Sequence, residues 1–165
     1  MDNTVTLPRY TDGEGVQVMA VSVAGRTGGS SFYFTYTNSD GVAGRTSKTV
    51  FQNSAAAIGT ILNNGINNNI TAQSFIGLQD GDSGVRSIES VTMLLPDVGL
   101  FALVLVKPIA TTLIRGIDAP VEIDYLAHKG EMPRIYDDAF LNFICLPNGT
   151  LAATALIGSL KCIWT

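Results

Sequence analysis

The chain has 165 residues, of which 46% are hydrophobic and only 15% charged, and its formal net charge is −4 at pH 7. A chain of this length fits one domain that buries roughly 70% of its unfolded surface, so no second domain or metal is needed for stability. The ten basic residues are scattered singly, which excludes the clustered Lys and Arg of a nucleic-acid-binding protein.

Membrane insertion and metal binding are also disfavoured. The longest apolar stretch, residues 98–106, is far shorter than the roughly 20 residues of a spanning helix, and we therefore expect a buried strand there. The first fifteen residues show no secretory signal, so we expect the chain to be made and folded in a cytoplasm. Cys145 and Cys162 are too few and too far apart for a metal site, and we expect both to be free, small buried hydrophobes.

Two strands are predicted near the N-terminus. Residues 16–21 alternate in the manner of a strand, and a glycine-rich loop follows at 24–30. Residues 32–37 predict a second strand, and Asp40-Gly41 predicts the turn of a hairpin. One face of this second strand carries Phe32, Phe34 and Tyr36.

Residues 47–70 allow two interpretations. Apolar residues between 50 and 62 fall on a helical stripe, with Ser47 or Thr49 as an N-cap and Asn64-Gly65 as a C-cap. However, the Asn, Ser, Thr and Gly residues inside the run weaken helix propensity. A helix over 47–62 and a pair of irregular strands therefore both stay open.

The β pattern is clearest from residue 77 onward. A Gly/Asp turn precedes an alternating strand at 87–94, and a second turn precedes the apolar run at 100–106. We predict that this second strand is buried on both faces and forms the centre of the fold.

Further strands are predicted in the C-terminal third. Residues 121–125 alternate as in a half-exposed strand that begins after Pro120. Two apolar runs between 139 and 164 are joined by Pro147-Asn148-Gly149, which favours a tight reversal. The last run places Leu160, Cys162 and Trp164 on one face.

These elements predict an all-β fold. We count eight to ten short strands separated by turns and expect an antiparallel sandwich, jelly-roll-like fold or barrel, with at most one short helix. Residues 1–165 would form a single β domain, with residues 1–14 as an extended N-terminal arm that could lie across a neighbour.

Residues 81–84 spell GDSG, the tetrapeptide around the nucleophile of trypsin-like serine proteases. Such a serine needs a basic histidine within hydrogen-bond reach. The only histidine, His128, follows Ser83 instead of preceding it, and its loop composition suggests a solvated or interface residue. Val85-Arg86 also replaces the glycine and proline that usually continue the motif. We instead predict a turn whose glycines supply positive φ, no catalytic residue and no enzymatic activity.

The acidic pairs give no stronger indication of chemistry. Asp80 and Asp82 resemble the start of a calcium loop, but the twelfth position from either residue is apolar, Val91 or Met93. Asp137-Asp138 has no supporting context. We expect solvated acids at these positions, no metal site and no cofactor.

Three stretches within residues 75–165 carry a family resemblance: GDSGVRSIESVTM, GLFALVLVKPIA and PRIYDDAFLNFICLPNGTLAATALIGSL. They resemble small structural proteins of tailed bacteriophages, including decoration, head-fibre and tail-associated proteins. The resemblance implies a virion component synthesised and assembled in the host cytoplasm, often a symmetric oligomer bound to a larger particle. It implies no catalytic residue.

The leading hypothesis is therefore a capsid decoration (cement) or head-fibre-base protein that binds the major capsid protein and stabilises the shell. A homo-oligomer is expected, with a trimer favoured, because a charge-poor β protein must hide apolar surface. The candidate subunit interface is Arg134, Ile135 and Tyr136, a mixture enriched in interface cores, although packing within one chain is the alternative. A tail or baseplate subunit is the second hypothesis. A carbohydrate-binding β-sandwich is a third, disfavoured by the sole tryptophan, Trp164, on an apolar strand face.

Overall fold

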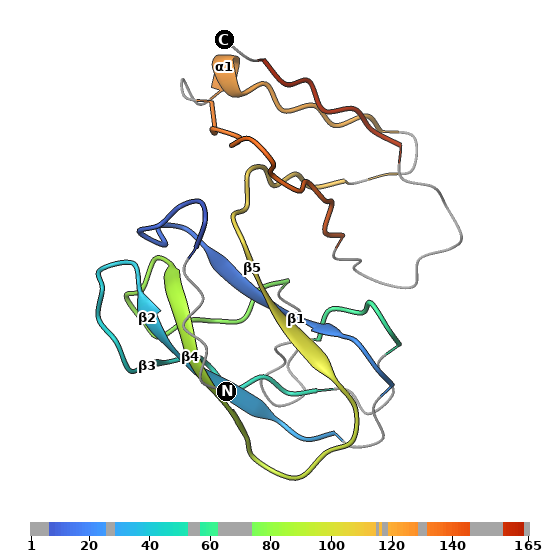
Figure 1. The fold of residues 1–165 in the computed structure, drawn as a ribbon. Helices are drawn as coiled ribbons and strands as arrows, with labels where there is room; N and C mark the ends of the chain where they lie inside the picture. The colour runs from blue at the N-terminus through green and yellow to red at the C-terminus, as the bar shows by residue number, and fades with distance from the viewer. Residues whose placement is uncertain are drawn as a thin grey trace.

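The computed structural model describes residues 7–25, 29–52, 57–62, 74–114, 116, 119–128, 132–145 and 157–163. Over these residues the chain is mainly β, with five strands and one short helix (Figure 1). The elements are β1 (Gln17–Ser22), β2 (Phe32–Asn38), β3 (Arg45–Thr46), β4 (Val85–Met93), β5 (Phe101–Val106) and α1 (Tyr125–His128). The predicted all-β class with at most one short helix is confirmed. This helix has four residues, and none in the described ranges is long and apolar enough to cross a membrane.

The strands form two antiparallel sheets. β1 pairs with β5, and β2 lies between β3 and β4. The β1–β5 register is regular, whereas the β2–β4 register shifts at Thr35/Tyr36 and again at Thr37/Asn38. Shifts of this kind bend a strand and increase its twist, which helps a short sheet to curve around a core.

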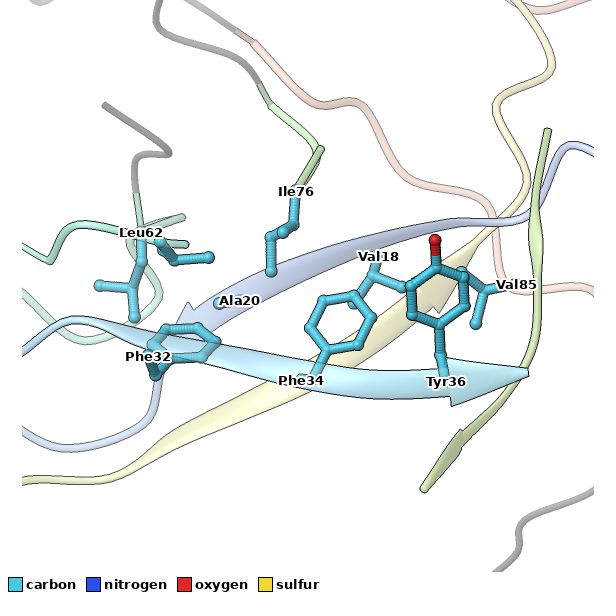
Figure 2. Packing of buried hydrophobic residues seen from close by; sticks show 9 residues of the cluster. Val18, Ala20, Phe32, Phe34, Tyr36, Leu62, Ile76 and Val85 are labelled. Atoms are coloured by element: carbon cyan, nitrogen blue, oxygen red, sulfur yellow. The ribbon is translucent and has the colours of Figure 1, made fainter. Parts of the chain in front are cut away.

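The hydrophobic core lies between the two sheets. β1 and β2 alternate between buried and half-buried residues, as the period-two pattern predicts. Phe32, Phe34 and Tyr36 of β2 are fully buried. In Figure 2, Phe34 and Tyr36 lie near Val18 of β1, whereas Phe32 lies near Ala20. Phe32 also stacks on Phe101 of β5 with 4.5 Å between ring centroids. Burying such side chains stabilises the fold by about 1.5–3 kcal/mol each.

Irregular segments close the second edge of β1. The amide of Ile76 donates to the carbonyl of Val18, and the amide of Lys48 donates to the carbonyl of Gly77, so residues 76–77 connect the two sheets. Residues 59–62 pair with the end of β1, and Ile61 forms a bridge with Val21. Both edges of β1 are thus occupied.

Residues 47–62 contain irregular β structure in the described part. Val50 forms an antiparallel bridge with Phe32, and residues 58–59 form a turn. The helical alternative is wrong for residues 47–52 and 57–62, because pairing with β1 and β2 outweighs the weak helical stripe. The remainder of the 47–70 segment, with the expected Asn64-Gly65 cap, lies outside the described residues.

The predicted strand at 100–106 exists as β5, but its predicted burial on both faces is wrong. Among the described strands it pairs only with β1, and five of its six residues are half-buried while Ala102 is exposed. An apolar run fits a strand covered on both faces, but here only one face packs against the core.

Residues 107–163, which we call the C-terminal segment, differ most from the prediction. No strand occurs in its described residues, so the strands expected at 121–125 and 139–145 and over the described part of the last run are wrong. At Tyr125–His128 a helical turn forms instead, because the Asp124 carboxylate accepts hydrogen bonds from the amides of Leu126 and Ala127. Residues 147–149 and Trp164 lie outside the described residues.

Every residue of the C-terminal segment whose exposure the structure describes is exposed or half-buried. Cys145 and Cys162 are both exposed, so the expectation that they are buried is wrong. Figure 1 shows the segment beyond the end of β5, away from the two sheets that hold the core.

Candidate functional site

The GDSG residues form a turn just before β4, and their two glycines have different roles. Gly81 has φ +93°, as the turn interpretation requires. Gly84 does not have a positive φ, so that part of the prediction is wrong. It is needed for close packing, because a Cβ at Gly84 would lie 2.0 Å from the carbonyl oxygen of Gly13. Gly13 itself has φ +76°, and a Cβ there would lie 2.7 Å from the backbone of Val85.

Asp82 is the centre of a polar network inside this turn. Its side chain is 3% exposed and accepts hydrogen bonds from Nε and one terminal nitrogen of Arg45, both at 3.0 Å. The Tyr36 hydroxyl donates to the same carboxylate at 2.5 Å, and the Asn38 amide donates at 2.9 Å. The Tyr36 hydroxyl in turn accepts the amide of Gln79 at 2.9 Å. The network thus fixes the turn onto β2 and β3.

The pKa values of Asp82 and Tyr36 in this network are strongly shifted. The hydrogen bonds from Arg45 hold the pKa of Asp82 at about 2; burial opposes this shift, and the bonds from Tyr36 and Asn38 reinforce it. Burial raises the pKa of Tyr36 to about 12, and its hydrogen bond to Asp82 adds to the effect. Asp82 is therefore an ionised, buried acceptor, and the expectation of a solvated turn acid is wrong for this residue.

Ser83 is exposed and takes part in a different set of contacts. Its hydroxyl donates to the Glu14 carboxylate at 3.0 Å and lies 2.9 Å from the hydroxyl of Ser39. His128 lies in α1, beyond β5 in the chain. The contacts of Ser83 are those of a turn residue that links the GDSG turn to Glu14 and Ser39.

The other acidic candidates are exposed. The carboxylate of Asp80 is 92% exposed and forms an ion pair with Lys48 at 2.8 Å. Asp137 and Asp138 form an exposed turn, in which Asp138 has φ +59°. Within the described ranges, no three His, Cys, Asp or Glu side chains are grouped so that they could hold a metal ion. A solvent-open hollow of about 560 Å³ beside the turn is lined by Gln17 and residues 74–82, but its buried acid is already paired with Arg45.

Two of the predicted interface residues Arg134, Ile135 and Tyr136 contact Tyr10 of the same chain, namely Arg134 and Tyr136. The Tyr10 hydroxyl donates to the carbonyl of Arg134 at 2.9 Å, and the rings of Tyr10 and Tyr136 meet edge to face at 5.0 Å. The Arg134 guanidinium also lies 4.8 Å from the centroid of the Tyr136 ring. Arg134 is exposed, whereas Ile135 and Tyr136 are half-buried.

Lys107, the residue that follows β5, also contacts Tyr10. The Lys107 ammonium lies 5.4 Å from the centroid of the Tyr10 ring and donates to the carbonyl of Glu14. Tyr10 therefore contacts both the start of the C-terminal segment and its residues 134–136. Residues 7–14, predicted as part of an arm, contact their own chain here, and residues 1–6 lie outside the described residues.

The Arg45–Asp82 pair was missed by sequence reasoning because the two residues are 37 positions apart. One signal pointed towards it. Tyr36 lies on the apolar face of the predicted strand, and a buried tyrosine hydroxyl usually needs a polar partner. The nearby GDSG turn supplies that partner.

No protein-family model matches this sequence, and comparisons with curated proteins and with solved structures returned no match.

Proposed function

We propose that this chain is a non-enzymatic structural subunit of a tailed-bacteriophage virion, a capsid decoration or head-fibre-base protein that acts by assembling. It would form a homo-oligomer, with a trimer favoured, and bind the major capsid protein to stabilise the shell. The virion setting rests on the sequence resemblance, and the assembly role rests on the surface of the chain.

The observation that carries the assembly role is the apolar surface that the described residues leave exposed. A standard interface takes roughly 800 Å² from each partner, and a closed ring of three requires two such contacts per subunit.

Most of the exposed apolar side chains lie in the C-terminal segment. Of the 21 exposed large hydrophobic side chains identified in the described residues, 12 lie after Lys107. Phe140 is 88% exposed and Ile157 is 92% exposed. Exposed large apolar side chains gathered in one segment support a surface that a partner covers.

The role of the GDSG motif supports a non-enzymatic function. Asp82 binds Arg45, Gly84 packs on Gly13, and Ser83 bonds to Glu14. Each residue thus has a structural partner that accounts for its presence in the turn.

The mass of the purified chain, measured by light scattering and combined with negative-stain imaging, tests the proposal. We expect discrete closed oligomers, with trimers favoured, that coat expanded empty capsids. Hexamers or long tubes would move the assignment to a tail or baseplate subunit. A stable monomer over the micromolar range would overturn the assembly role.

A further inference from the structure

Tyr10 lies in an N-terminal loop that is fastened to the sheets. The Arg86 side chain donates from Nε to the carbonyl of Thr11 at 3.1 Å, and Gly13 packs so closely on Val85 that a Cβ would not fit between them. The amide of Gly13 donates to the carbonyl of Tyr10 at 2.7 Å, which closes a turn. Tyr10 has φ +53°, an uncommon conformation for a residue other than glycine, which persists only where the surrounding structure holds it. The loop is therefore a fixed support for the Tyr10 side chain.

From this support Tyr10 contacts the C-terminal segment at two places that are far apart in its sequence. At the first residue of the segment, the Lys107 ammonium lies 5.4 Å from the centroid of the Tyr10 ring. Further along, the Tyr10 hydroxyl donates to the carbonyl of Arg134 at 2.9 Å, and its ring meets the Tyr136 ring edge to face. One side chain thus joins the two ends of residues 107–136.

Such contacts matter because the described residues of the C-terminal segment contribute little to the core. They are exposed or half-buried, and none of them forms a strand. The apolar side chains identified in and around the hydrophobic core lie between Val18 and Leu105, before the segment begins. Parts of a protein with few buried apolar contacts open at a lower free energy than the core does. Opening of this segment therefore does not require the core to unfold.

We propose that Tyr10 is a clasp that holds the C-terminal segment beside the sheets, and that the segment opens as a unit when the contacts of Tyr10 break. The clasp comprises Tyr10, Lys107, Arg134 and Tyr136, and the core stays folded in the open state. Opening lets the exposed apolar side chains that follow Tyr136 move relative to the sheets. The clasp lies within one chain, so it does not depend on the proposed assembly.

Limited digestion of the full chain with trypsin measures the opening, because a protease cleaves the transiently opened state. Tyr10→Ala removes both the hydroxyl and the ring from the clasp, and cleavage after Arg134 should become about tenfold faster. Tyr33→Ala is the matched control, since Tyr33 is a half-buried tyrosine of β2 that lies opposite Thr92 of β4. It should leave cleavage after Arg134 unchanged. Equal cleavage rates in the two variants would overturn the clasp.

Tyr10→Gly separates the clasp from the folding of the loop. It removes the same contacts as Tyr10→Ala, but glycine adopts the positive φ of this position without strain. Cleavage after Arg134 should therefore be accelerated as much as in Tyr10→Ala, while the midpoint of urea unfolding stays close to that of the natural chain. Cleavage at the natural rate in Tyr10→Gly would refute the proposal.

A double-mutant cycle tests whether the two tyrosines act together. Tyr136→Ala removes the opposite ring and should also speed up cleavage after Arg134. Because both changes break the same contact, the double variant should be cleaved more slowly than the product of the two single effects predicts. Digestion of all variants at one protein concentration makes the rates comparable. Effects that multiply fully would show that the two residues act independently, which contradicts a shared clasp.

Discussion

Replacing Asp82 by Asn should destabilise the fold even though the change is nearly isosteric. The carboxylate accepts four hydrogen bonds, from two Arg45 nitrogens, the Tyr36 hydroxyl and the Asn38 amide. A single amide oxygen can accept about two of them, and the amide nitrogen accepts none. Arg45 would also lose the charge of its partner.

The magnitude follows from the pKa of Asp82. A shift from the ordinary value of 3.8 to about 2 corresponds to at most about 2.5 kcal/mol at neutral pH. Solvent at Arg45, whose side chain is 26% exposed, screens the pair and reduces this contribution to about 1–2 kcal/mol. Adding the unsatisfied buried donors, we expect Asp82→Asn to lower the free energy of unfolding by about 2–3 kcal/mol.

Urea unfolding at a fixed protein concentration measures this difference, since the proposed assembly would make stability depend on concentration. Asp80→Asn is the control, because Asp80 lies two residues away but its carboxylate is 92% exposed, and its ion pair should contribute less than about 0.5 kcal/mol. If both variants unfold at the same urea concentration, the account of the Asp82 network is wrong.

The pH dependence gives an independent check. Because the folded pKa of Asp82 is depressed, its stabilising contribution is complete above pH 3.8 and is lost as the pH falls towards about 2. The stability gap between the natural chain and Asp82→Asn should therefore shrink between about pH 4 and pH 2. A gap that stays constant over this range would contradict the assignment.

Three further outcomes are expected. Gly84→Ala should cost about 3 kcal/mol of folding stability in denaturant unfolding, because its Cβ would meet the Gly13 carbonyl, whereas Gly25→Ala, with no atom near its Cβ, should be close to neutral. Phe101→Ala removes the ring stacked on Phe32 and should cost about 3–4 kcal/mol, against less than about 0.5 kcal/mol for the exposed Val42→Ala; similar values for the two would be inconsistent with the core described above. Ser83→Ala should leave assembly unchanged. A fluorophosphonate should not label Ser83 in the natural chain, and labelling detected by mass spectrometry would contradict the turn assignment.

The sequence predicted correctly those strands in which the alternation of apolar side chains matches the way the strand packs in the fold. β2 lies where aromatic residues alternate between 32 and 37, because its inner face meets β1 and β5 across the core. β5 was located correctly, but its burial depends on how many strands lie beside it, which an apolar run does not encode. At residues 121–125, Asp124 caps a helical turn, so a local hydrogen bond outweighs the alternation. The exposure of Cys145 was also beyond local pattern, because it depends on tertiary packing.

The candidate site was predicted only in part. The turn at GDSG and the positive φ of Gly81 follow from local chemistry. The pairing of Asp82 with Arg45 and the packing of Gly84 on Gly13 join residues far apart in the chain, so no local pattern indicates them.

The order of the core along the chain has a consequence for synthesis. All the fully buried apolar side chains identified lie between Val16 and Val85, and β5 adds the last half-buried strand to this core. A ribosome adds roughly 5–20 residues per second, so the core sequence is complete several seconds before residue 163 is made. The core can therefore fold while the exposed apolar side chains after Lys107 are still being translated. This order would limit premature aggregation in a crowded cell.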